Sequence, residues 1–419
     1  WDEIPVPAHI QLHGYDRPQY VNVQYPWDGR EQIAPGQVPE RFNPVASYIR
    51  DFTLERPLQA GERLSVSFHG AESGIALWLN GRYIGYATDS FTPSEFDLTD
   101  ALVAGENRLA AQVFKWTRGS WLEDQDFYRF SGIFRDVVLY RRPSVHVEDL
   151  HITTQLAGDN ASAEVVVAID LVGEGTVSAR LEGVGALARS DDGAFRIHVE
   201  RPRLWSPEDP ALYELTIEAR DAAGALIEVI EQRVGVRRFA IEEGVLKLNG
   251  QRIVFFGVNR HEFGLNGRVV TREETDHDLR ALKRIGVNAV RTSHYPNSTY
   301  FYELADHYGL MVIDEMNMES HGVWDTIIKM GVPVEDAVPG EKPEWLPALL
   351  DRASSMVERD RNHASVVMWS CGNESFGGKN IRDVADHFRA LDARPVHYEG
   401  VHWDDRYPET TDVVSQMYT

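Results

Sequence analysis

The sequence predicts a multidomain protein of the β and α/β classes, in which two β-sandwiches precede a unit of alternating strands and helices. Three observations support this fold class. The chain has 419 residues, which is enough for two to three domains. Residues 1–238 contain short strand-like runs between Gly- and Pro-containing turns and almost no helical period. From about residue 239, short apolar runs alternate with amphipathic segments of helical length.

Composition excludes several classes of protein. The 42 basic and 65 acidic residues give a net charge of −23, which opposes binding to nucleic-acid phosphates or to an anionic membrane surface. Cys371 is the single cysteine, so a disulfide framework and a thiolate metal cluster are excluded, and a cytoplasmic location is favoured. No apolar run approaches the roughly 18 residues of a membrane helix. The chain starts at Trp1 without Met, and we interpret it as truncated at both ends.

Residues 1–142 are predicted to form the first β-sandwich. The predicted strands cover residues 46–54, 63–69, 75–79, 83–87, 109–116 and 133–140. The first two runs alternate apolar and polar residues, and Asn80-Gly81 is a strong hairpin signal between the third and fourth. The loop at 121–128 combines acids with aromatic residues, which is unusual for a simple connection.

Residues 143–238 are predicted to form a second sandwich with the strand spacing of an immunoglobulin-like domain. The predicted strands cover residues 145–153, 163–171, 176–181, 195–199, 212–219 and 227–234. No part of this stretch gathers acids, histidines and amides, so we interpret it as a structural spacer.

Residues 239–419 repeat a strand-then-helix pattern. The predicted strands are 253–258, 287–291, 310–314, 366–370, 396–399 and 413–416, and the helices are 272–285, 298–307, 344–360 and 379–391. Short apolar strands of this kind are buried on both faces of a parallel sheet. The pattern therefore predicts either a doubly wound sheet or a (β/α)₈ barrel, of which about six strands are present.

Polar residues follow the ends of these strands. The segments are 259–262 (Asn-Arg-His-Glu), 292–297 (Thr-Ser-His-Tyr-Pro-Asn), 317–322 (Asn-Met-Glu-Ser-His-Gly), 371–375 (Cys-Gly-Asn-Glu-Ser) and 417–418 (Met-Tyr). In a parallel barrel all such loops open at the carboxyl end of the strands, where active sites are built. The pattern favours a barrel enzyme over a chance cluster of surface polar residues.

Glu374 is the strongest candidate for an acid that donates and accepts protons. It follows an almost wholly apolar strand, and we expect partial burial to raise its pKa. Asn373 beside it can donate its amide to a substrate hydroxyl. His261 and His294 each follow a strand and could donate to sugar hydroxyls or stabilise charge in a transition state.

Glu319 and His321 lie two positions apart, on one side of a segment expected to be extended. Together with Glu374 they could bind a divalent cation. Two carboxylates favour Mg²⁺ or Mn²⁺, whereas the imidazole shifts the preference slightly toward Mn²⁺ or Zn²⁺. A hydrogen-bond network without a metal is the alternative. The chain has no nucleophile elbow and no Gly-rich phosphate loop after a strand.

Several longer stretches carry a family resemblance. They are residues 13–16 (His-Gly-Tyr-Asp), 22–26 (Asn-Val-Gln-Tyr-Pro), 93–98 (Pro-Ser-Glu-Phe-Asp-Leu), 122–126, 130–136, 205–208 (Trp-Ser-Pro-Glu), 212–213, 259–262, 293–297, 319–322, 359–363 and 373–375. On these residues the chain resembles the bacterial β-galactosidases of glycoside hydrolase family 2, of the lac-operon type. The resemblance implies a jelly-roll sandwich at 1–142, an immunoglobulin-like sandwich at 143–238 and a (β/α)₈ TIM barrel at 239–419. It also implies retaining hydrolysis of terminal β-galactosides through a covalent galactosyl-enzyme.

The resemblance further implies roles for single residues. Glu374 corresponds to the general acid/base and, with Glu319 and His321, to the ligands of Mg²⁺ (or Mn²⁺). Asn373 corresponds to a contact near the sugar 2-hydroxyl, and His261 and His294 to histidines that bind the galactosyl group. Asp126 corresponds to a residue that contacts both the sugar and a Na⁺ ion. Asn22 corresponds to a first-domain substrate contact, and Tyr418 to a tyrosine near the nucleophile.

One part of the family pattern has no counterpart in the chain. Retaining hydrolysis uses two carboxyls about 5–5.5 Å apart. In the family the nucleophilic Glu ends the seventh barrel strand, and Glu399 is a poor substitute for it. We therefore expect these 419 residues alone to be inactive and the full-length form to be a homo-oligomeric enzyme.

Two alternative functions stay open. The first is a family-2 β-glucuronidase or β-mannosidase. For the glucuronidase we would expect basic side chains in the sugar pocket, because carboxylate substrates usually call for Arg or Lys. The second is a non-catalytic galactoside-binding module or a complementation fragment whose partner carries the nucleophile.

Overall fold

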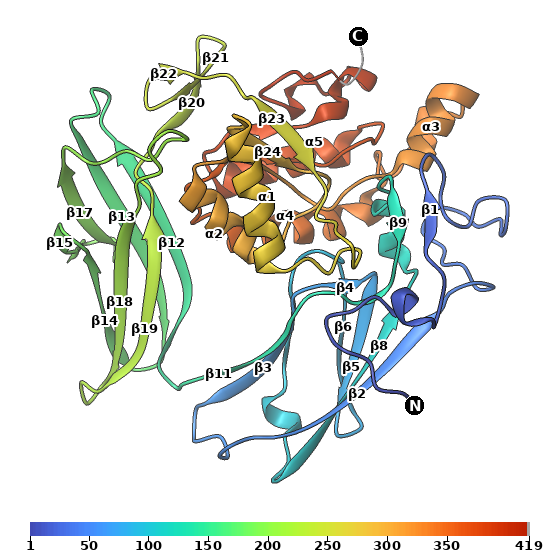
Figure 1. The fold of residues 1–419 in the computed structure, drawn as a ribbon, viewed down its shortest axis with the longest axis horizontal. Coiled ribbons are helices and arrows are strands. Elements are labelled where there is room, and N and C mark those ends of the chain that lie inside the picture. The colour runs from blue at the N-terminus through green and yellow to red at the C-terminus, as the bar shows by residue number, and fades with distance from the viewer. Residues whose placement is uncertain (417–419) are drawn as a thin grey trace.

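The computed structural model describes residues 1–416. Figure 1 shows a first β-sandwich in blue and cyan, a second sandwich in green, and a unit of parallel strands and helices in yellow to red. This order of architectures confirms the predicted fold class. In Figure 1 the third unit lies beside the second sandwich and above the first, and both sandwiches contact it.

The first sandwich consists of antiparallel sheets. One contains, in spatial order, β2 (Val45–Thr53), β8 (Glu106–Phe114), β5 (Gly74–Leu79) and β6 (Arg82–Thr88). The other contains β11 (Val137–Arg142), β3 (Arg63–Phe68) and β7 (Ser94–Asp97), and the short pairs are β1 (Gln19–Val21) with β9 (Phe127–Arg129) and β10 (Gly132–Ile133) with β4 (Ala71–Glu72). The inward-facing Val66, Leu77 and Val113 are fully buried. Each such side chain contributes about 1.5–3 kcal/mol of hydrophobic stabilisation.

The second sandwich also consists of two antiparallel sheets. One contains β12 (His146–Leu156), β13 (Ser162–Val172), β17 (Phe195–Glu200) and β16 (Ala188–Arg189). The other contains β15 (Gly185–Ala186), β14 (Gly175–Leu181), β18 (Tyr213–Asp221) and β19 (Leu226–Val234). Ala163, Val165 and Val167 alternate with outward-facing residues along β13 and fill the core. The alternation that predicted these strands is therefore the alternation between core and solvent.

A small antiparallel sheet connects the second sandwich to the third unit. It contains β20 (Phe239–Glu242), β21 (Val245–Leu248) and β22 (Gln251–Arg252). The predicted strand at 253–258 is wrong in its bounds, because pairing in the parallel sheet begins at Gly257. Ile253 donates its N–H to Leu246 of the small sheet, and Phe256 is largely exposed. The apolar run therefore crosses from one sheet to the other and is not a single buried strand.

The parallel sheet of the third unit follows chain order. Its strands are β23 (Gly257–Arg260), β24 (Ala289–Thr292), β25 (Met311–Glu315), β26 (Val366–Ser370) and β27 (Val396–His397). The helices between and after them are α1 (Arg272–Arg284), α2 (Thr299–Tyr308), α3 (His321–Met330), α4 (Leu346–Asp360) and α5 (Lys379–Leu391). Strands that neighbour each other in chain order form a barrel, whereas a doubly wound sheet reverses its order.

The described residues contain five paired strands of this barrel. In place of the predicted sixth strand at 413–416, Val413 forms a single parallel bridge with His397 of β27. The bridge lies where the next barrel strand would pair. The chain there runs parallel to β27, as predicted, but the paired segment is shorter than the predicted strand.

Local signals explain where some helices begin. The Glu274 N–H donates to Thr271 Oγ1 over 3.2 Å, and the Thr271 N–H donates to Glu274 Oε2 over 2.8 Å. This capping box satisfies two N–H groups at the start of α1. Helix α3 was not predicted. It contains the β-branched Val323, Thr326 and Ile327 and has no side-chain cap at Ser320, so its helical signal is weak.

The hydrophobic cores continue across the domain boundaries. Tyr25, Trp27 and Trp121 of the first sandwich pack in one cluster with Met318 and Trp345 of the barrel. In a second cluster, Trp205 of the second sandwich packs with barrel residues that include Ala289 and Met368. The three units therefore form a single packed body.

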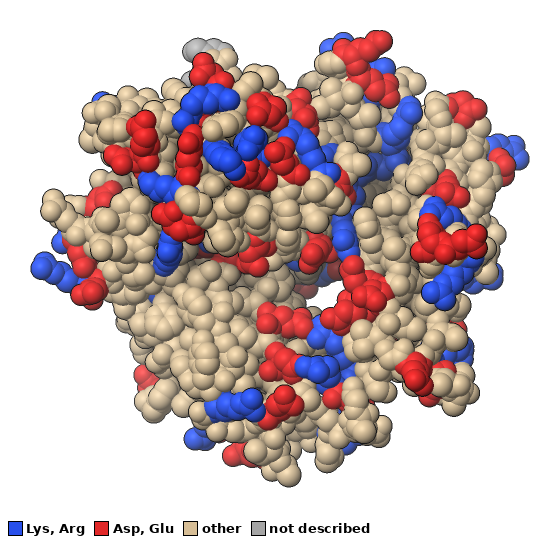
Figure 2. All heavy atoms as spheres, turned by 180° about the vertical axis from the view of Figure 1, so that it is seen from behind, with Lys and Arg blue, Asp and Glu red and all other residues tan. Residues whose placement is uncertain are grey.

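Charged side chains of both signs lie on the surface. Figure 2 shows acidic and basic side chains intermixed over the face opposite to that of Figure 1. Within residues 1–416, no helix combines the length and apolar character required to cross a membrane.

Candidate active site

A cavity of about 490 Å³ opens at the carboxyl end of the barrel strands. It is lined by Asp126, Asn259, His261, Arg291, His294, Asn373, Glu374, His397, Glu399, Ser415 and Gln416. This volume lies in the range of about 300–1,000 Å³ typical of small-molecule sites. Lining residues lie at or shortly after the carboxyl ends of four of the five strands, β23, β24, β26 and β27, and the first sandwich contributes Asp126. The cavity therefore has the predicted location.

Glu374 lies on the loop that follows β26. The turn depends on Gly372, whose φ is 124° and where a Cβ atom would come within 2.4 Å of the Met318 carbonyl oxygen. The Glu374 side chain is 13% exposed, and its Oε2 lies 2.9 Å from His321 Nδ1. Burial raises the pKa of Glu374, but contacts with His321 outweigh burial, so its pKa lies below the ordinary value. The predicted rise is therefore wrong for the site in this state.

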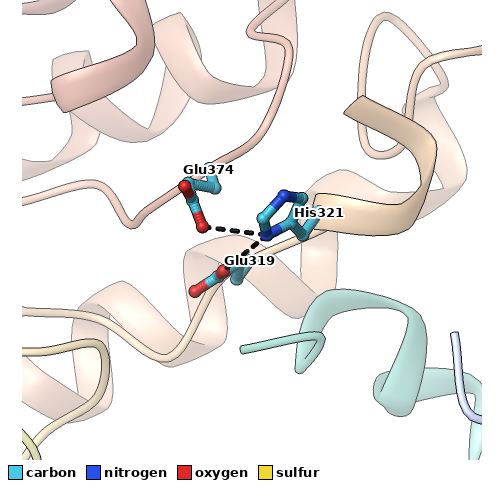
Figure 3. A group of neighbouring side chains, drawn as sticks. All are labelled: Glu319, His321 and Glu374. Carbon is cyan, nitrogen blue, oxygen red and sulfur yellow. Dashed lines mark ion pairs between the residues drawn. The ribbon is translucent and has the colours of Figure 1, made fainter. Parts of the chain in front are cut away.

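Glu319, His321 and Glu374 converge on one point, as Figure 3 shows. His321 Nδ1 lies 3.7 Å from Glu319 Oε1, and the three possible ligand atoms lie within 4.8 Å of one another. The predicted extended geometry at 319–321 is wrong, because His321 is the first residue of α3. The start of the helix turns the imidazole toward the two carboxylates.

The chemistry of these three groups fits a hard divalent cation. Glu319 Oε1 and His321 Nδ1 are buried, and neither has a partner with hydrogen-bond geometry among the described residues. Burial lowers the pKa of His321, but Glu319 and Glu374 outweigh burial and raise it to about 10. Burial, together with the charge of Glu374, raises the pKa of Glu319. Two carboxylates and one imidazole are suitable ligands for Mg²⁺ or Mn²⁺.

Glu315, the last residue of β25, holds two side chains that line the cavity. Arg291 Nε donates to its Oε2 over 2.8 Å, and His294 Nδ1 lies 2.6 Å from its Oε1. Ser370 Oγ also donates to Oε2, over 2.5 Å. Burial raises the pKa of Glu315, but Arg291 and His294 outweigh burial and lower it to about 2. Glu315 is therefore a fixed negative charge beneath the cavity.

Hydrogen bonds continue from this acid to the candidate cation site. Arg291 donates to Asn373 Oδ1 over 3.0 Å, and Asn373 Nδ2 donates to Glu319 Oε2 over 3.1 Å. Asn373 is thus oriented on both sides by neighbours from β24 and the loop after β25. A side chain held in this way is well placed to position a ligand group.

The ring centroids of the two candidate histidines, His261 and His294, lie 5.5 Å apart, and the two ring planes are perpendicular. Burial is the main cause that lowers the pKa of His261, to about 4, and it also lowers the pKa of His294. Both imidazoles are therefore neutral near pH 7. A neutral imidazole offers one donor and one acceptor, which suits the hydroxyl groups of an uncharged ligand.

The end of β27 contributes His397 and Glu399 to the cavity. The sequence analysis considered Glu399 only as a poor substitute for the nucleophile and did not single out His397. His397 is buried and makes contacts with Ser370 Oγ at 2.9 Å and Ser415 Oγ at 3.1 Å. Burial lowers its pKa to about 4. Glu399 shares the cavity with Glu374, and burial raises its pKa to about 7, with Arg291 opposing the rise. The prediction placed both residues inside a strand, 396–399, which concealed their position at its carboxyl end.

The first sandwich reaches the cavity through its loop before β9. Asp126 lines the cavity and accepts a hydrogen bond of 2.5 Å from Tyr20 Oη. Gln125 Nε2 donates to the His294 carbonyl over 3.2 Å. Asn22 is exposed just after β1 and is not among the residues that line the cavity. Tyr418 lies outside the described residues.

Sequence models of one family match nearly the whole chain. "Glycosyl hydrolases family 2, sugar binding domain" matches residues 1–143, "Glycosyl hydrolases family 2" matches 145–237, and "Glycosyl hydrolases family 2, TIM barrel domain" matches 239–419. The chain therefore belongs to glycosyl hydrolase family 2, as its motifs suggested.

Curated relatives share the similarity over the full chain. A beta-galactosidase of Halalkalibacterium halodurans is 47% identical over 100% of this chain and 42% of its own length. A beta-galactosidase of Streptococcus thermophilus is 47% identical over 99% of this chain and 41% of its own length. The chain thus spans about two fifths of these relatives. It covers 70% of a beta-galactosidase large subunit of Lactobacillus helveticus, at 39% identity.

Solved structures with the same fold include β-glucuronidases. The enzyme of Bifidobacterium dentium has a TM-score of 0.76 and 25% identity, with 89% of this chain and 69% of that chain covered. The enzyme of an uncultured Clostridium species has a TM-score of 0.75 and 28% identity, with coverages of 89% and 66%. These likenesses support the three-unit architecture.

Proposed function

We propose that the full-length protein hydrolyses terminal, non-reducing β-D-galactose residues of β-galactosides such as lactose, with retention of configuration. The observation that carries this proposal is Glu374, which lines the cavity at the end of the fourth barrel strand beside the cation site. The 47% identity to proteins named beta-galactosidase supports galactose as the sugar.

In this proposal Glu374 acts first as an acid and then as a base. It donates a proton to the glycosidic oxygen as the bond to the leaving group breaks, and it later accepts a proton from the attacking water. Its lowered pKa favours the base step. Binding of a sugar would exclude water from the remaining exposed part of its carboxyl and raise its pKa for the acid step.

The proposed intermediate is a covalent galactosyl-enzyme, which requires a nucleophilic carboxylate about 5–5.5 Å from the acid. We propose that this carboxylate follows residue 419, because no residue of 1–419 matches the family's nucleophile and the chain covers only 41–42% of the length of these relatives. Tyr418 would lie near it.

The other cavity residues are proposed to bind the sugar. His261 and His294 would contact hydroxyl groups. Because His294 Nδ1 already binds Glu315, its Nε2 would act as an acceptor. Asn373 would bind near the 2-hydroxyl. Asp126 would accept from a hydroxyl and contact a Na⁺ ion. Asn22, which lies outside the cavity lining, would contact the substrate from the first sandwich. Glu319, His321 and Glu374 would hold Mg²⁺ (or Mn²⁺), which supplies positive charge beside the acid/base when bound.

A β-glucuronidase is the competing function, because solved structures with this fold carry that name. A glucuronide requires a cationic partner for its carboxylate. Arg291 is the basic residue that lines the cavity, and its guanidinium is already bound to Glu315 and Asn373. This engagement favours an uncharged sugar over a uronic acid.

We further propose a cytoplasmic location, which the single buried cysteine supports. We also propose that the full-length protein is a homo-oligomer, which the family supports.

The experiment compares turnover of aryl β-galactoside and aryl β-glucuronide by the full-length protein and its Glu374→Gln variant. We expect preference for the galactoside and a loss of about 10²–10⁴-fold in the variant, which is the usual contribution of a general acid/base. The loss should be larger for substrates with poorer leaving groups. Preference for the glucuronide would refute the choice of sugar. Galactose binding without turnover would indicate a non-catalytic binding module.

A further inference from the structure

The start of α3, which carries His321, depends on the first sandwich. The first N–H groups of a helix have no acceptor within the helix and need one from elsewhere. Ser320, the N-cap residue of α3, provides no side-chain cap. Its Oγ donates to the Val338 carbonyl and also contacts Ser375 Oγ at 2.9 Å. Instead, the Gly322 N–H donates over 2.8 Å to Asp124 Oδ2, which belongs to the loop of the first sandwich.

The same loop holds the backbone of Glu319. The Glu319 N–H donates to the Leu122 carbonyl over 2.9 Å, and the Asp124 N–H donates to the Glu319 carbonyl over 3.1 Å. These two bonds form a parallel bridge between Glu123 and Glu319. Glu319 and His321, two of the three candidate cation ligands, are thus held in place by residues of the first sandwich. In Figure 1, α3 lies close to β9 and β1 of the first sandwich.

Asp124 is itself held rigidly. Arg129 donates to its Oδ1 over 2.8 Å and to the Glu123 carbonyl over 2.9 Å, and both side chains of the ion pair are buried. Burial raises the pKa of Asp124 to about 7, and Arg129 opposes this rise. An acceptor whose two oxygens are each committed to one donor has little freedom to rotate.

Gly322 is required for this contact by close packing. A Cβ atom at Gly322 would come within 2.8 Å of the Tyr25 ring, and Tyr25 Oη donates to the Trp121 carbonyl over 3.0 Å. Two side chains of the first sandwich, those of Asp124 and Tyr25, therefore contact the same residue of α3, Gly322. A side chain at this position would push α3 away from Asp124.

We propose that Asp124 and Gly322 form a positioning contact through which the first sandwich sets the geometry of the cation site. Asp124 is a positioning residue, since it acts through α3 and its carboxylate does not reach the ligand atoms as a fourth ligand. The inference rests on the proposed binding of a divalent cation by Glu319, His321 and Glu374. Removal of a residue that orients a metal ligand through hydrogen bonds typically lowers metal affinity by about 10–100-fold.

The test measures Mg²⁺ and Mn²⁺ affinity of the full-length protein by calorimetry, without substrate. Asp124→Asn keeps the size of the side chain, but its amide presents only one acceptor to Arg129 and Gly322. Gly322→Ala disturbs the same contact from the barrel. We expect each variant to bind Mg²⁺ about 10-fold or more weakly, by analogy with other such partners. The Mg²⁺ affinity of the double variant should be only slightly lower than that of the single variant that binds Mg²⁺ more weakly, because both changes break the same contact.

Asp149→Asn is the matched control. Asp149 belongs to the second sandwich and forms an ion pair of 2.6 Å with Arg361 of the barrel, so it also links a sandwich to the barrel. We expect wild-type cation affinity in this variant. If Asp124→Asn fails to fold, Gly322→Ala decides the question.

Folded Asp124→Asn and Gly322→Ala variants with wild-type Mg²⁺ affinity would overturn the inference, and so would a wild-type protein that binds neither cation. Weakened cation binding in a protein that does not hydrolyse galactosides would support the positioning contact while refuting the proposed function. The two proposals are therefore separable.

Discussion

Glu315 shows how one buried acid controls several side chains of the cavity. It accepts hydrogen bonds from Arg291 and Ser370 and contacts His294, and water does not reach it. Its pKa of about 2 lies below the ordinary value of 4.5 because Arg291 and His294 outweigh burial. An acid with a lowered folded-state pKa binds fewer protons in the folded state than in the unfolded state between those two values. Its contribution to stability is therefore complete above about pH 5 and is lost as the pH falls toward 2.

We expect Glu315→Gln to remove this part of the acid dependence. At pH 7 the variant should lose about 3–5 kcal/mol of unfolding free energy, since it leaves Arg291 without its charged partner. Near pH 2 the two proteins should differ little. Urea unfolding at a series of pH values measures both effects.

The control is Glu303→Gln, which removes an exposed partner of Arg272 and should cost less than about 1 kcal/mol. An equal loss at pH 2 and pH 7 for Glu315→Gln would contradict the assignment of its charge. Glu315 itself was missed from the sequence, although it directly follows the predicted strand end at Asp314, because the polar segment singled out after that strand began only at Asn317.

The proposed cation site gives a second prediction at the scale of residues. A ligand that binds the folded state alone raises its stability, by about 2.7 kcal/mol at one hundred times the dissociation constant. We expect Mg²⁺ to raise the melting temperature of the full-length protein, and EDTA to reverse the rise. His321→Ala should abolish the Mg²⁺-dependent shift and leave the shift caused by galactose itself. The same Mg²⁺ shift in His321→Ala would exclude this triad as the site.

Among the elements, α1 and α3 show opposite relations between sequence and structure. The start of α1 was predictable because Thr271 and Glu274 form a local capping box. The start of α3 was not predictable, because its N–H group is satisfied by Asp124, which lies 198 positions earlier in the chain. Local patterns report local bonds, and they contain no information on an acceptor from another domain.

The capping box gives a prediction at this scale. Thr271→Ala should cost about 1 kcal/mol of stability, within the usual range of 0.5–2 kcal/mol for a lost N-cap. Ser298→Ala is the matched control, since Ser298 is the N-cap residue of α2 and makes no side-chain cap bond. Chemical unfolding followed by far-UV circular dichroism measures both. A larger loss in Ser298→Ala than in Thr271→Ala would contradict the role of the box.

For the whole molecule, the order of the domains was predictable and their contacts were not. Alternating strands predicted the two sandwiches. The later strand-helix repeat predicted a doubly wound sheet or a barrel, and the polar loops after the strands, together with the family resemblance, favoured the barrel. The seams depend on single side chains that have no sequence pattern. Asn362, at the start of the segment leading to β26, accepts from the Ile152 N–H and donates to the Leu150 carbonyl, each over 2.8 Å. It binds the barrel to an edge of β12.

We expect Asn362→Ala to loosen the second sandwich from the barrel. The change leaves a backbone N–H and a carbonyl without partners, at a cost of about 1–3 kcal/mol for each buried group. Calorimetry should show an earlier, separate transition for the second sandwich. Gln232→Ala, a change at a partly exposed residue of the same sandwich, should leave a single profile like that of the wild type. Unchanged calorimetry in Asn362→Ala would show that the apolar cluster around Trp205 alone joins the two units.

The bridge between Glu123 and Glu319 also affects the order of folding. Contacts between residues far apart in the chain form late, because the loop between them must close first and loses conformational entropy. The loop closed here contains the entire second sandwich. The barrel strands can pair as soon as they are synthesised, but α3 obtains its acceptor only after the first sandwich docks against them. A nascent chain would thus pair its first barrel strands before it orders the start of α3, where Glu319 and His321 lie.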